Sequence, residues 1–395
     1  MILFSCSKKQ EKLNNDEELI TLPANTNWMA GSWGITFPVF GGERLDKEVA
    51  KGYDLPAGAE EIVTELTSVG HVFTNLSYFA HSHYFTLSTN SYVDVANEIH
   101  PSIVPNSDND EIIFEVLQKF KDSNKKIILY ISTNYFENAA ADNPEIKAAW
   151  DVYYIDKFAG DEYAAYKNLI KGFIEQVKDY ADGYWLDTTN VLANEGKLDD
   201  FIDMIRATDP NAAISANYEK NYFKDENGEY ILVDSDGIND EDPTDYKVIL
   251  HEPLNSLQDF TNGHVTPLGQ GAPPNSWAYE EYTIPNMTTE PWFDFEGKLV
   301  LKHAWFPIRK RWHVPTQDLV FNTEQAYRYV KRVIDGNASI TLANTIDYGI
   351  SNPGHMMADE MVMMKEINKR LLSNPIPPYE TYVRPEGAIL VGETK

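Results

Sequence analysis

Short runs of apolar, β-branched and aromatic residues alternate with longer amphipathic stretches from residue 27 onward. The short runs have the length of strands, and the longer stretches repeat their apolar residues every three to four positions, as helices do. Eight strand-and-helix units can be counted in this way. The predicted strands cover residues 32–40, 71–79, 125–133, 182–188, 212–217, 246–252, 298–306 and 338–344. The clearest predicted helices cover residues 59–69, 110–123, 161–181, 198–208, 323–335 and 358–372.

This alternation predicts an α/β protein, a (β/α)8 TIM-like barrel with long loops after strands 5 and 6. In such barrels the active face lies at the carboxyl ends of the strands and in the loops that follow them. The two long loops are residues 218–245, with a hairpin-like ENGEYILV, and residues 253–297. Loops of this length are usually functional or disordered, and their Tyr and Trp content favours function. We predict a catalytic barrel over residues 27–373, a tether or linker at 1–26 and a tail at 374–395.

Charge and aromatic content then narrow the choice of partner. Lys and Arg number 33 and Asp and Glu number 61, which gives a net charge of −28. Such a charge repels phosphate backbones and anionic membrane surfaces, so we predict no nucleic-acid partner. Aromatic residues make up 12% of the chain, with 23 Tyr and 8 Trp. Rings with a polar handle suit a site that stacks on sugars, so an oligosaccharide or polysaccharide is the favoured partner.

The sequence carries no motif for a cofactor or a metal. No GxGxxG, GxxxxGK or GxSxG occurs, so dinucleotide, P-loop and serine-hydrolase functions have no support. The acidic stretch DSDGINDED (234–242) has its glycine at the fourth position, whereas an EF-type calcium loop needs it at the sixth. His81 and His83 would share one face of a strand, but no third metal ligand has a matching spacing. We therefore predict neither a cofactor nor a metal.

The single cysteine, Cys6, ends the run Leu3-Phe4-Ser5-Cys6 and is followed by a polar stretch. This pattern is typical of a bacterial lipobox, whose cysteine becomes acylated. The residues before Cys6 are too few for a signal h-region, so we expect a longer precursor. The sequence thus predicts an exported bacterial lipoprotein, periplasmic or at the cell surface, that meets the membrane only through its lipid. The alternative is an ordinary cysteine in an irregular terminus.

The strongest local feature is YADGYWLDTTN (180–190), in which Asp187 stands at the carboxyl end of the fourth predicted strand. A carboxylate at this position faces the mouth of the barrel, where catalytic residues gather. The alternative is an Asp that caps a helix or solvates a loop. Trp185 lies beside Asp187 and favours a site in which burial perturbs the carboxylate.

This segment resembles the Y-x-P-D-x-x-W-x-D-G motif of the α-L-fucosidase family of retaining glycoside hydrolases, whose last Asp is the nucleophile. With one residue fewer after the Tyr, the residues Tyr180, Asp182, Trp185 and Asp187 match, whereas Ala181 and Thr188 replace Pro and Gly. FAHSHYFTL (79–87) resembles the family's K-H-H-D-G-F-x-L segment, with His81 and His83 at two of its polar positions. VKRVIDGNASITLANTIDYGISNPG (330–354) resembles the last strand of the family.

Two departures separate the chain from that family. The first strand has ITFPVFGG (35–42), with Phe37 or Pro38 where the family carries a sugar-binding histidine. The family's C-terminal β-sandwich is also absent. The resemblance therefore implies a diverged, barrel-only relative. Enzymes of the same clan that cleave sulfated fucans internally resemble the chain as well.

A retaining mechanism needs a second ionisable group about 5 Å from the nucleophile, acting first as acid and then as base. Glu281, with Glu280 as its competitor, stands where fucosidases place this residue. His251 and Glu252 end the sixth predicted strand, and the endo-acting fucan hydrolases are similar in using a histidine. All of these remain candidates.

The segment HAWFPIRKRWHVP (303–315) carries a basic cluster after the seventh predicted strand. Arg309 and Arg311 could bind a sulfate or carboxylate on the sugar through bidentate contacts, with the flanking tryptophans as stacking platforms. The alternative is that these arginines pair with surface acids. The residues predicted to contact substrate are His81, His83, Trp33, Trp185, Asn217, Trp277, Glu280, Trp305, Arg309, Arg311, Trp312 and His313.

Together these features predict a retaining glycoside hydrolase with Asp187 as nucleophile and Glu281 or His251 as acid/base. Its expected substrates are α-L-fucose-type linkages, L-fucosyl or L-galactosyl, with or without sulfate, in algal or host glycans. One alternative is an endo-acting sulfated-fucan hydrolase with His251 as acid/base. The other is a surface lipoprotein that binds glycans without cleaving them.

Overall fold

The computed structural model gives the arrangement of most of the chain. It describes residues 23–39, 53–76, 90–99, 104, 107–133, 135, 144–217, 253, 255–264, 279–295, 297–310, 312–320, 322–384 and 386, and the backbone of 222–224 and 230–232.

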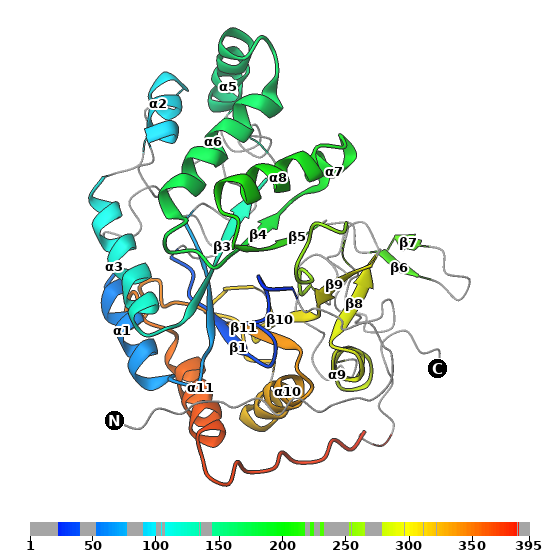
Figure 1. Ribbon diagram of the computed structural model, residues 1–395. Coiled ribbons are helices and arrows are strands. Elements are labelled where there is room, and N and C mark those ends of the chain that lie inside the picture. The colour runs from blue at the N-terminus through cyan, green and yellow to red at the C-terminus, as the bar shows by residue number, and fades with distance from the viewer. Residues whose placement is uncertain are drawn as a thin grey trace.

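A curled sheet of seven parallel strands forms the centre of the molecule, and helices surround it (Figure 1). The strands follow one another in the order β10-β11-β1-β2-β3-β4-β5. They are β1 (Trp33–Thr36), β2 (His71–Asn75), β3 (Lys126–Ser132), β4 (Gly183–Asp187), β5 (Ala213–Ala216), β10 (His303–Pro307) and β11 (Ser339–Ala343). Two antiparallel hairpins are added, β6 (Tyr222–Lys224) with β7 (Tyr230–Leu232) and β8 (Trp292–Phe295) with β9 (Lys298–Leu301). This order is the one that consecutive βα units of a barrel would give.

The outer face of the sheet is covered by six helices of ten residues or more. These are α1 (Leu55–Glu65), α3 (Asp108–Asp122), α6 (Glu162–Val177), α8 (Leu198–Thr208), α10 (Thr323–Asp335) and α11 (Ala358–Leu371). Their starts follow local chemistry, since Asp161 caps α6 and Asn322 forms a capping box with Gln325 on α10. Within the described residues, no helix has the length and apolarity that a membrane crossing needs.

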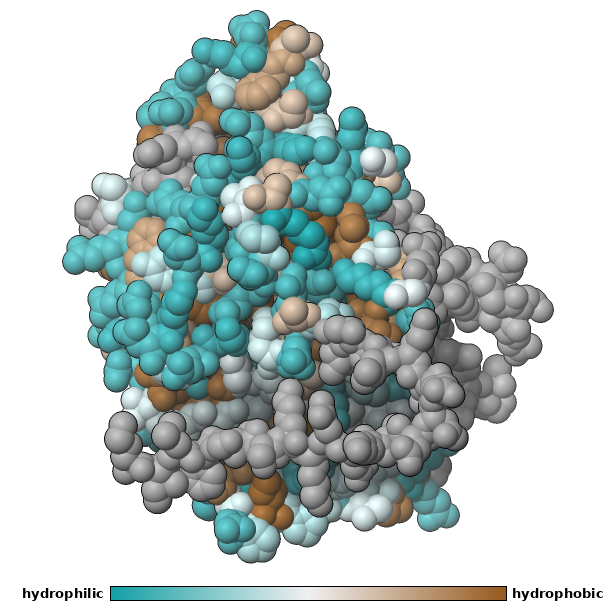
Figure 2. Space-filling view, viewed as in Figure 1, coloured by the Kyte–Doolittle hydropathy of each residue, from teal (hydrophilic) through white to brown (hydrophobic). Residues whose placement is uncertain are grey.

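Five further helical segments lie outside this layer or are short. They are α2 (Asn90–Ile99), α5 (Pro144–Lys157), α7 (Asn190–Asn194), α9 (Ile284–Thr289) and the π-helical turn η4 (Tyr279–Thr283). Helices α2 and α5 follow β2 and β3 and project furthest from the sheet (Figure 1). The face in Figure 2 is mostly hydrophilic, and apolar atoms gather near the tip, where α5 exposes Val152 and Ile155.

Most predicted strands coincide with observed ones, but the seventh is divided. The apolar run 298–306 changes partner at Lys302, so that β9 pairs with β8 while β10 pairs with β11. Only Lys302 and His303 interrupt this run, and two polar residues inside a strand-like pattern do not reveal a change of partner. The sixth predicted strand, 246–252, lies outside the described residues.

An irregular stretch, the bridging segment (residues 258–264), connects the two edge strands of the sheet. Asp259 donates its backbone N–H to Ile214 of β5 at 2.7 Å and accepts the Ile214 N–H through its carboxylate at 2.9 Å. On the other side the Trp305 N–H of β10 donates to the Gly263 carbonyl at 2.9 Å. Gly263 has φ +88°, and a Cβ there would meet the Trp305 nitrogen at 2.7 Å, so glycine is required. The bridging segment therefore contacts both β5 and β10.

The concave face of the sheet holds its own apolar cluster, separate from the larger one under the helices. Its buried members are Met29, Phe73, Ile128, Tyr130, Trp185, Ala213, Phe260, Leu301, Trp305 and Ala343. Alternate residues of a strand point to opposite faces, so Trp185 and Asp187 of β4 share this face.

A chain of hydrogen bonds crosses the concave face below that cluster. The Thr341 hydroxyl lies 2.8 Å from Nε2 of both His71 and His303. Because His303 Nδ1 faces the Thr261 carbonyl, it must carry a proton, and its Nε2 accepts from Thr341. His71 Nε2 then donates to Thr341, and His71 Nδ1 accepts from Ser32. Both imidazoles are neutral in this order, and burial lowers the pKa of His71 and that of His303, the latter to about 3.

These neutral histidines predict acid-sensitive stability. The unfolded chain takes up protons on each imidazole below pH 6.5, whereas the folded chain does not, so stability falls as pH drops from 6.5. For each such imidazole the free energy of unfolding falls by about 2 kcal/mol between pH 7 and pH 5. In His71→Gln, the difference in unfolding free energy between these pH values should shrink by about that amount, measured by urea unfolding. An unchanged difference would show that His71 does not stay neutral.

Candidate active site

Asp187 ends β4 with its carboxylate buried and held at both oxygens. Asn217, directly after β5, donates from Nδ2 to Oδ1 at 2.8 Å, and the Tyr130 hydroxyl of β3 donates to Oδ2. Burial raises the pKa of Asp187 above its usual value. The hydrogen bonds from Tyr130, Asn217 and the Thr188 backbone oppose this rise without cancelling it. Asp187 as a whole is 9% exposed.

Four rings pack together on the concave face and form the aromatic cluster (Trp185, His264, Trp305 and Trp312), which begins at Trp185, two residues before Asp187 on β4. The Trp185 ring centroid lies 4.9 Å from Trp305 and 5.3 Å from His264, and His264 stacks on Trp312 at 5.1 Å. The indole of Trp185 donates to the Asn262 carbonyl at 2.7 Å, and that of Trp305 donates to Thr36 at 2.9 Å. These bonds fix Trp185 and Trp305, which are 1% and 3% exposed, so the two rings form a rigid buried base, and His264 and Trp312 are the rings of the cluster that stay partly exposed.

His264 was missed by the sequence analysis. It ends the bridging segment, inside what was predicted as a loop, and its ring lies against those of Trp185, Trp305 and Trp312. Its backbone N–H donates to the Asn262 side chain at 2.7 Å. Burial lowers the pKa of His264 to about 4, so the imidazole is neutral near pH 7. Alternation of Phe260, Asn262 and His264 was the only available signal.

Glu280 and Glu281 lie elsewhere, on the outer face of β10, where Tyr279 of η4 stacks on Phe306 at 4.2 Å. Glu280 is 3% exposed and is bound by Arg328 at 2.8 Å and by Arg332 at 2.7 Å, both from α10. Glu281 accepts a hydrogen bond from Tyr382 of the C-terminal tail at 2.9 Å. Because Asp187 is on the concave face, the prediction of either glutamate as acid/base, and of Glu280 as a substrate contact, is corrected.

Arg309 is also buried, and its guanidinium is bound by other residues of the protein. It is 3% exposed, and its guanidinium donates to Glu360, to Asp359 at 2.6 Å and to the Gln317 carbonyl at 2.6 Å. Burial raises the pKa of Glu360 to about 7 although Arg309 opposes the shift. All three nitrogens of the Arg309 guanidinium are occupied by these partners. The predicted sulfate contact of Arg309 is therefore corrected to a structural ion pair.

The remaining predicted residues divide into three groups. Trp33 is the first residue of β1, at the end of the sheet opposite Asp187, and its indole donates to Ser68 at 3.3 Å, so its predicted sugar contact is corrected. His313 is buried beside Trp312 and bonds the Asn344 carbonyl at 2.8 Å. Six predicted residues lie outside the described residues: His81, His83, His251, Glu252, Trp277 and Arg311.

Two buried polar atoms near the aromatic cluster lack partners. Asn217 Oδ1 and Trp312 Nε1 make no hydrogen bond. An acceptor and a donor are thus left for a ligand. The described residues contain no group of three or more His, Cys, Asp and Glu that could hold a metal.

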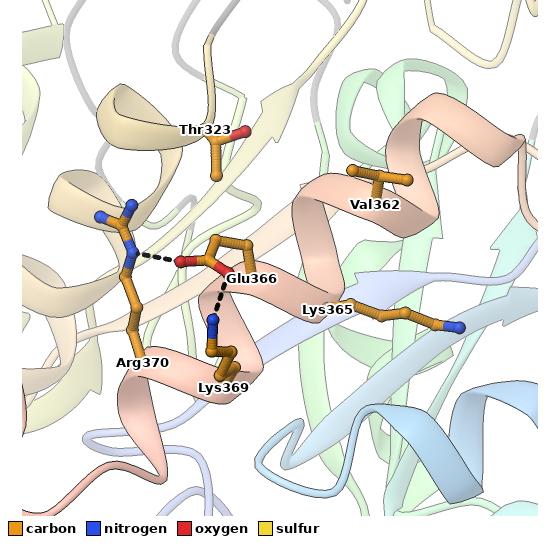
Figure 3. Close-up of a pocket in the computed structure, with 6 residues that line it drawn as sticks. All are labelled: Thr323, Val362, Lys365, Glu366, Lys369 and Arg370. Carbon is orange, nitrogen blue, oxygen red and sulfur yellow. Dashed lines mark hydrogen bonds and ion pairs between the residues drawn. The ribbon is translucent and has the colours of Figure 1, made fainter.

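A separate depression of about 470 Å³ lies on the outer surface beside α10 and α11 (Figure 3). It is lined by Thr323, Val362, Lys365, Glu366, Lys369 and Arg370. Lys369 and Arg370 both pair with Glu366, at 3.3 and 2.9 Å. The depression is therefore a solvated surface of paired charges, and it lies away from Asp187.

Comparisons with known proteins show the family of the chain and its fold. The family described as Mef1, endo-α(1,4)-fucoidanase, matches residues 23–394. The solved structure of endo-fucoidan hydrolase P5AFcnA from glycoside hydrolase family 107 is 48% identical, covers 95% of this chain and 100% of its own, and superposes with a TM-score of 0.83. None of the curated proteins compared matches the chain.

Two more distant structures share the fold alone. Endo-fucoidan hydrolase MfFcnA4 from glycoside hydrolase family 107 is 14% identical over 88% of this chain and 53% of its own, with a TM-score of 0.67. Alpha-L-fucosidase isoenzyme 1 from Paenibacillus thiaminolyticus is 14% identical over 89% of this chain and 76% of its own, with a TM-score of 0.51. The predicted fucosidase resemblance is thus a distant one of fold. From its match over residues 23–394 and its 48% identity to P5AFcnA, the chain belongs to the endo-fucoidanase family, glycoside hydrolase family 107.

Proposed function

We propose that this protein cleaves sulfated fucans internally, by a retaining mechanism with Asp187 as nucleophile. The observation that carries the proposal is the buried Asp187 carboxylate, held by Tyr130 and Asn217 at a strand end in a chain of this family. The endo-acting alternative thereby takes precedence over hydrolysis of terminal α-L-fucose-type residues.

In the first step an oxygen of Asp187 attacks the anomeric carbon, and the glycosidic bond breaks as its oxygen is protonated. In the second step water attacks the same carbon and frees the carboxylate. Tyr130 and Asn217 keep the carboxylate in one orientation through both steps. Trp312, which is only partly buried, supplies apolar surface for the sugar, and Trp185 packs behind it as part of the buried cluster.

We assign the acid/base role to His264. The bridging segment lies between β5 and β10, bonded to both, and His264 stands at its end, as Asn217 stands directly after β5. The centroid of the His264 ring lies 5.3 Å from that of Trp185. Trp185 is two residues before the proposed nucleophile Asp187 on β4. The sulfates of a bound substrate favour the charged imidazolium and so raise the low pKa of His264. When the substrate binds, His264 therefore takes up the proton that it later donates. His251 stays a candidate, to be tested in parallel.

Export as a lipoprotein stays a prediction, since Cys6 lies outside the described residues. It suits this function, because a polysaccharide must be met outside the cytoplasm.

Asp187→Asn should lower kcat on a sulfated fucan oligosaccharide by at least about a thousandfold, because the covalent step is lost. Asp182→Asn, at the other end of β4, is the matched control and should keep wild-type kcat. A rate for Asp187→Asn above about a tenth of wild type would remove Asp187 as nucleophile.

His264→Gln should lower kcat on the natural polysaccharide by roughly a hundred- to ten-thousandfold. With a 2,4-dinitrophenyl leaving group, which departs unprotonated, formation of the covalent intermediate should be nearly as fast as in wild type, seen as a pre-steady-state burst. His251→Gln is measured beside it. If His251→Gln shows this pattern and His264→Gln does not, the role moves to His251.

The net charge of −28 predicts an unusual salt dependence. A sulfated polyanion is repelled at long range, and the Debye length falls from about 30 Å at 0.01 M to about 8 Å at 0.15 M salt. Adding NaCl over this range should therefore raise kcat/KM for a sulfated oligosaccharide and leave a desulfated one unchanged. A steady fall with salt would mean that a local positive field dominates the encounter.

A further inference from the structure

Thr188 follows the nucleophile with a backbone conformation that suits it poorly. Its φ is +55°, in the left-handed region, and among the described residues it is the only β-branched one there. The others outside glycine are Asn124, Tyr135, Ala159, His313 and Asn337. A branched Cβ is crowded at positive φ, whereas glycine adopts it freely. Strain of this kind persists when the side chain does something that glycine could not.

The Thr188 side chain joins the end of β4 to the end of β3. Its Oγ1 lies 2.9 Å from the Ser132 hydroxyl, accepts from the Thr133 N–H at 3.3 Å and donates to the Asp187 carbonyl at 2.7 Å. Thr133 donates to that same carbonyl from its hydroxyl at 2.8 Å. Thr188 is 5% exposed, so water offers little replacement for these bonds.

Thr189 makes the corresponding connection to β5. Its hydroxyl donates to the Asn217 carbonyl at 2.7 Å, and its backbone N–H donates to the same oxygen at 3.0 Å. Asn217 in turn holds the Asp187 carboxylate through Nδ2 at 2.8 Å. Thr189 therefore holds the backbone of Asn217, whose side chain holds the Asp187 carboxylate.

We propose that Thr188 and Thr189 form a hydroxyl clamp that positions Asp187 between Tyr130 and Asn217. Strands β3, β4 and β5 are neighbours (Figure 1), and the clamp ties the end of β4 to one neighbour through each threonine. Neither threonine is a catalytic residue, because each acts through the orientation of Asp187. The inference rests on the proposed role of Asp187.

The decisive variant is Thr188→Gly, which removes the hydroxyl and relieves the strain together. Because the relieved strain offsets the cost of the lost hydrogen bonds, we expect its Tm to stay within a few degrees of wild type, kcat to fall roughly ten- to a hundredfold, and KM to stay within about threefold. Thr188→Ser, which keeps the hydroxyl, should recover most of kcat. A merely structural threonine would give the opposite pattern, a changed Tm with wild-type kcat.

Asn124→Gly is the matched control, since Asn124 has φ 60° in the turn between α3 and β3, at the far end of the sheet. It should leave kcat unchanged. If Thr188→Gly does not fold, Thr189→Val and Thr189→Ser provide the same comparison on the β5 side, with kcat lost in Val and kept in Ser.

Wild-type kcat in Thr188→Gly, or equal kcat in Thr189→Val and Thr189→Ser, would overturn the clamp. The outcome is separable from the proposed function. An inactive Asp187→Asn beside a fully active Thr188→Gly would reject the clamp alone, whereas an active Asp187→Asn would reject the nucleophile.

Discussion

A buried carboxylate needs hydrogen-bond donors in place of water. The buried acids of this protein differ in whether these donors are charged or neutral. Glu280 and Glu360 are bound by arginines, Glu280 by Arg328 and Arg332 and Glu360 by Arg309. In the part of the chain that the structure describes, Asp187 has no such cation and is held by neutral donors. A neutral donor orients a carboxylate without cancelling its charge, so the charge is left to meet the developing positive charge of a sugar.

Parallel neighbours make this arrangement possible. Ser132 and Asp187 are partners in the register of β3 and β4, and Leu186 is the partner of Ala216 on β5. Asp187, the proposed nucleophile, therefore receives a donor from each side, Tyr130 of β3 and Asn217 directly after β5. The residue after Asp187, Thr188, has positive φ, a conformation that glycine adopts freely and a β-branched residue adopts only with strain.

The parts of the structure that sequence predicted are those with local causes. Strand alternation and helical period located β1 to β5 and the outer helices, and the end of β4 singled out Asp187. The bridging segment has no regular strand pattern, because side chains such as Asp259 replace part of its backbone ladder. Arg309 and Glu360 are 51 positions apart, and nothing local in the sequence indicates which of 61 acids an arginine will meet.

The acid/base and the charge of the substrate are physically linked. An imidazole packed against Trp185 and Trp312 is poorly solvated, so its charged form is disfavoured in the empty site. A polymer that carries sulfates supplies the missing negative charge within the range where screening is weak. Protonation of His264 and binding of a sulfated chain then favour each other by the same free energy, as any two linked equilibria must. A neutral glycan offers no such gain, so under the proposed role of His264 selectivity for sulfate arises at the proton of this imidazole.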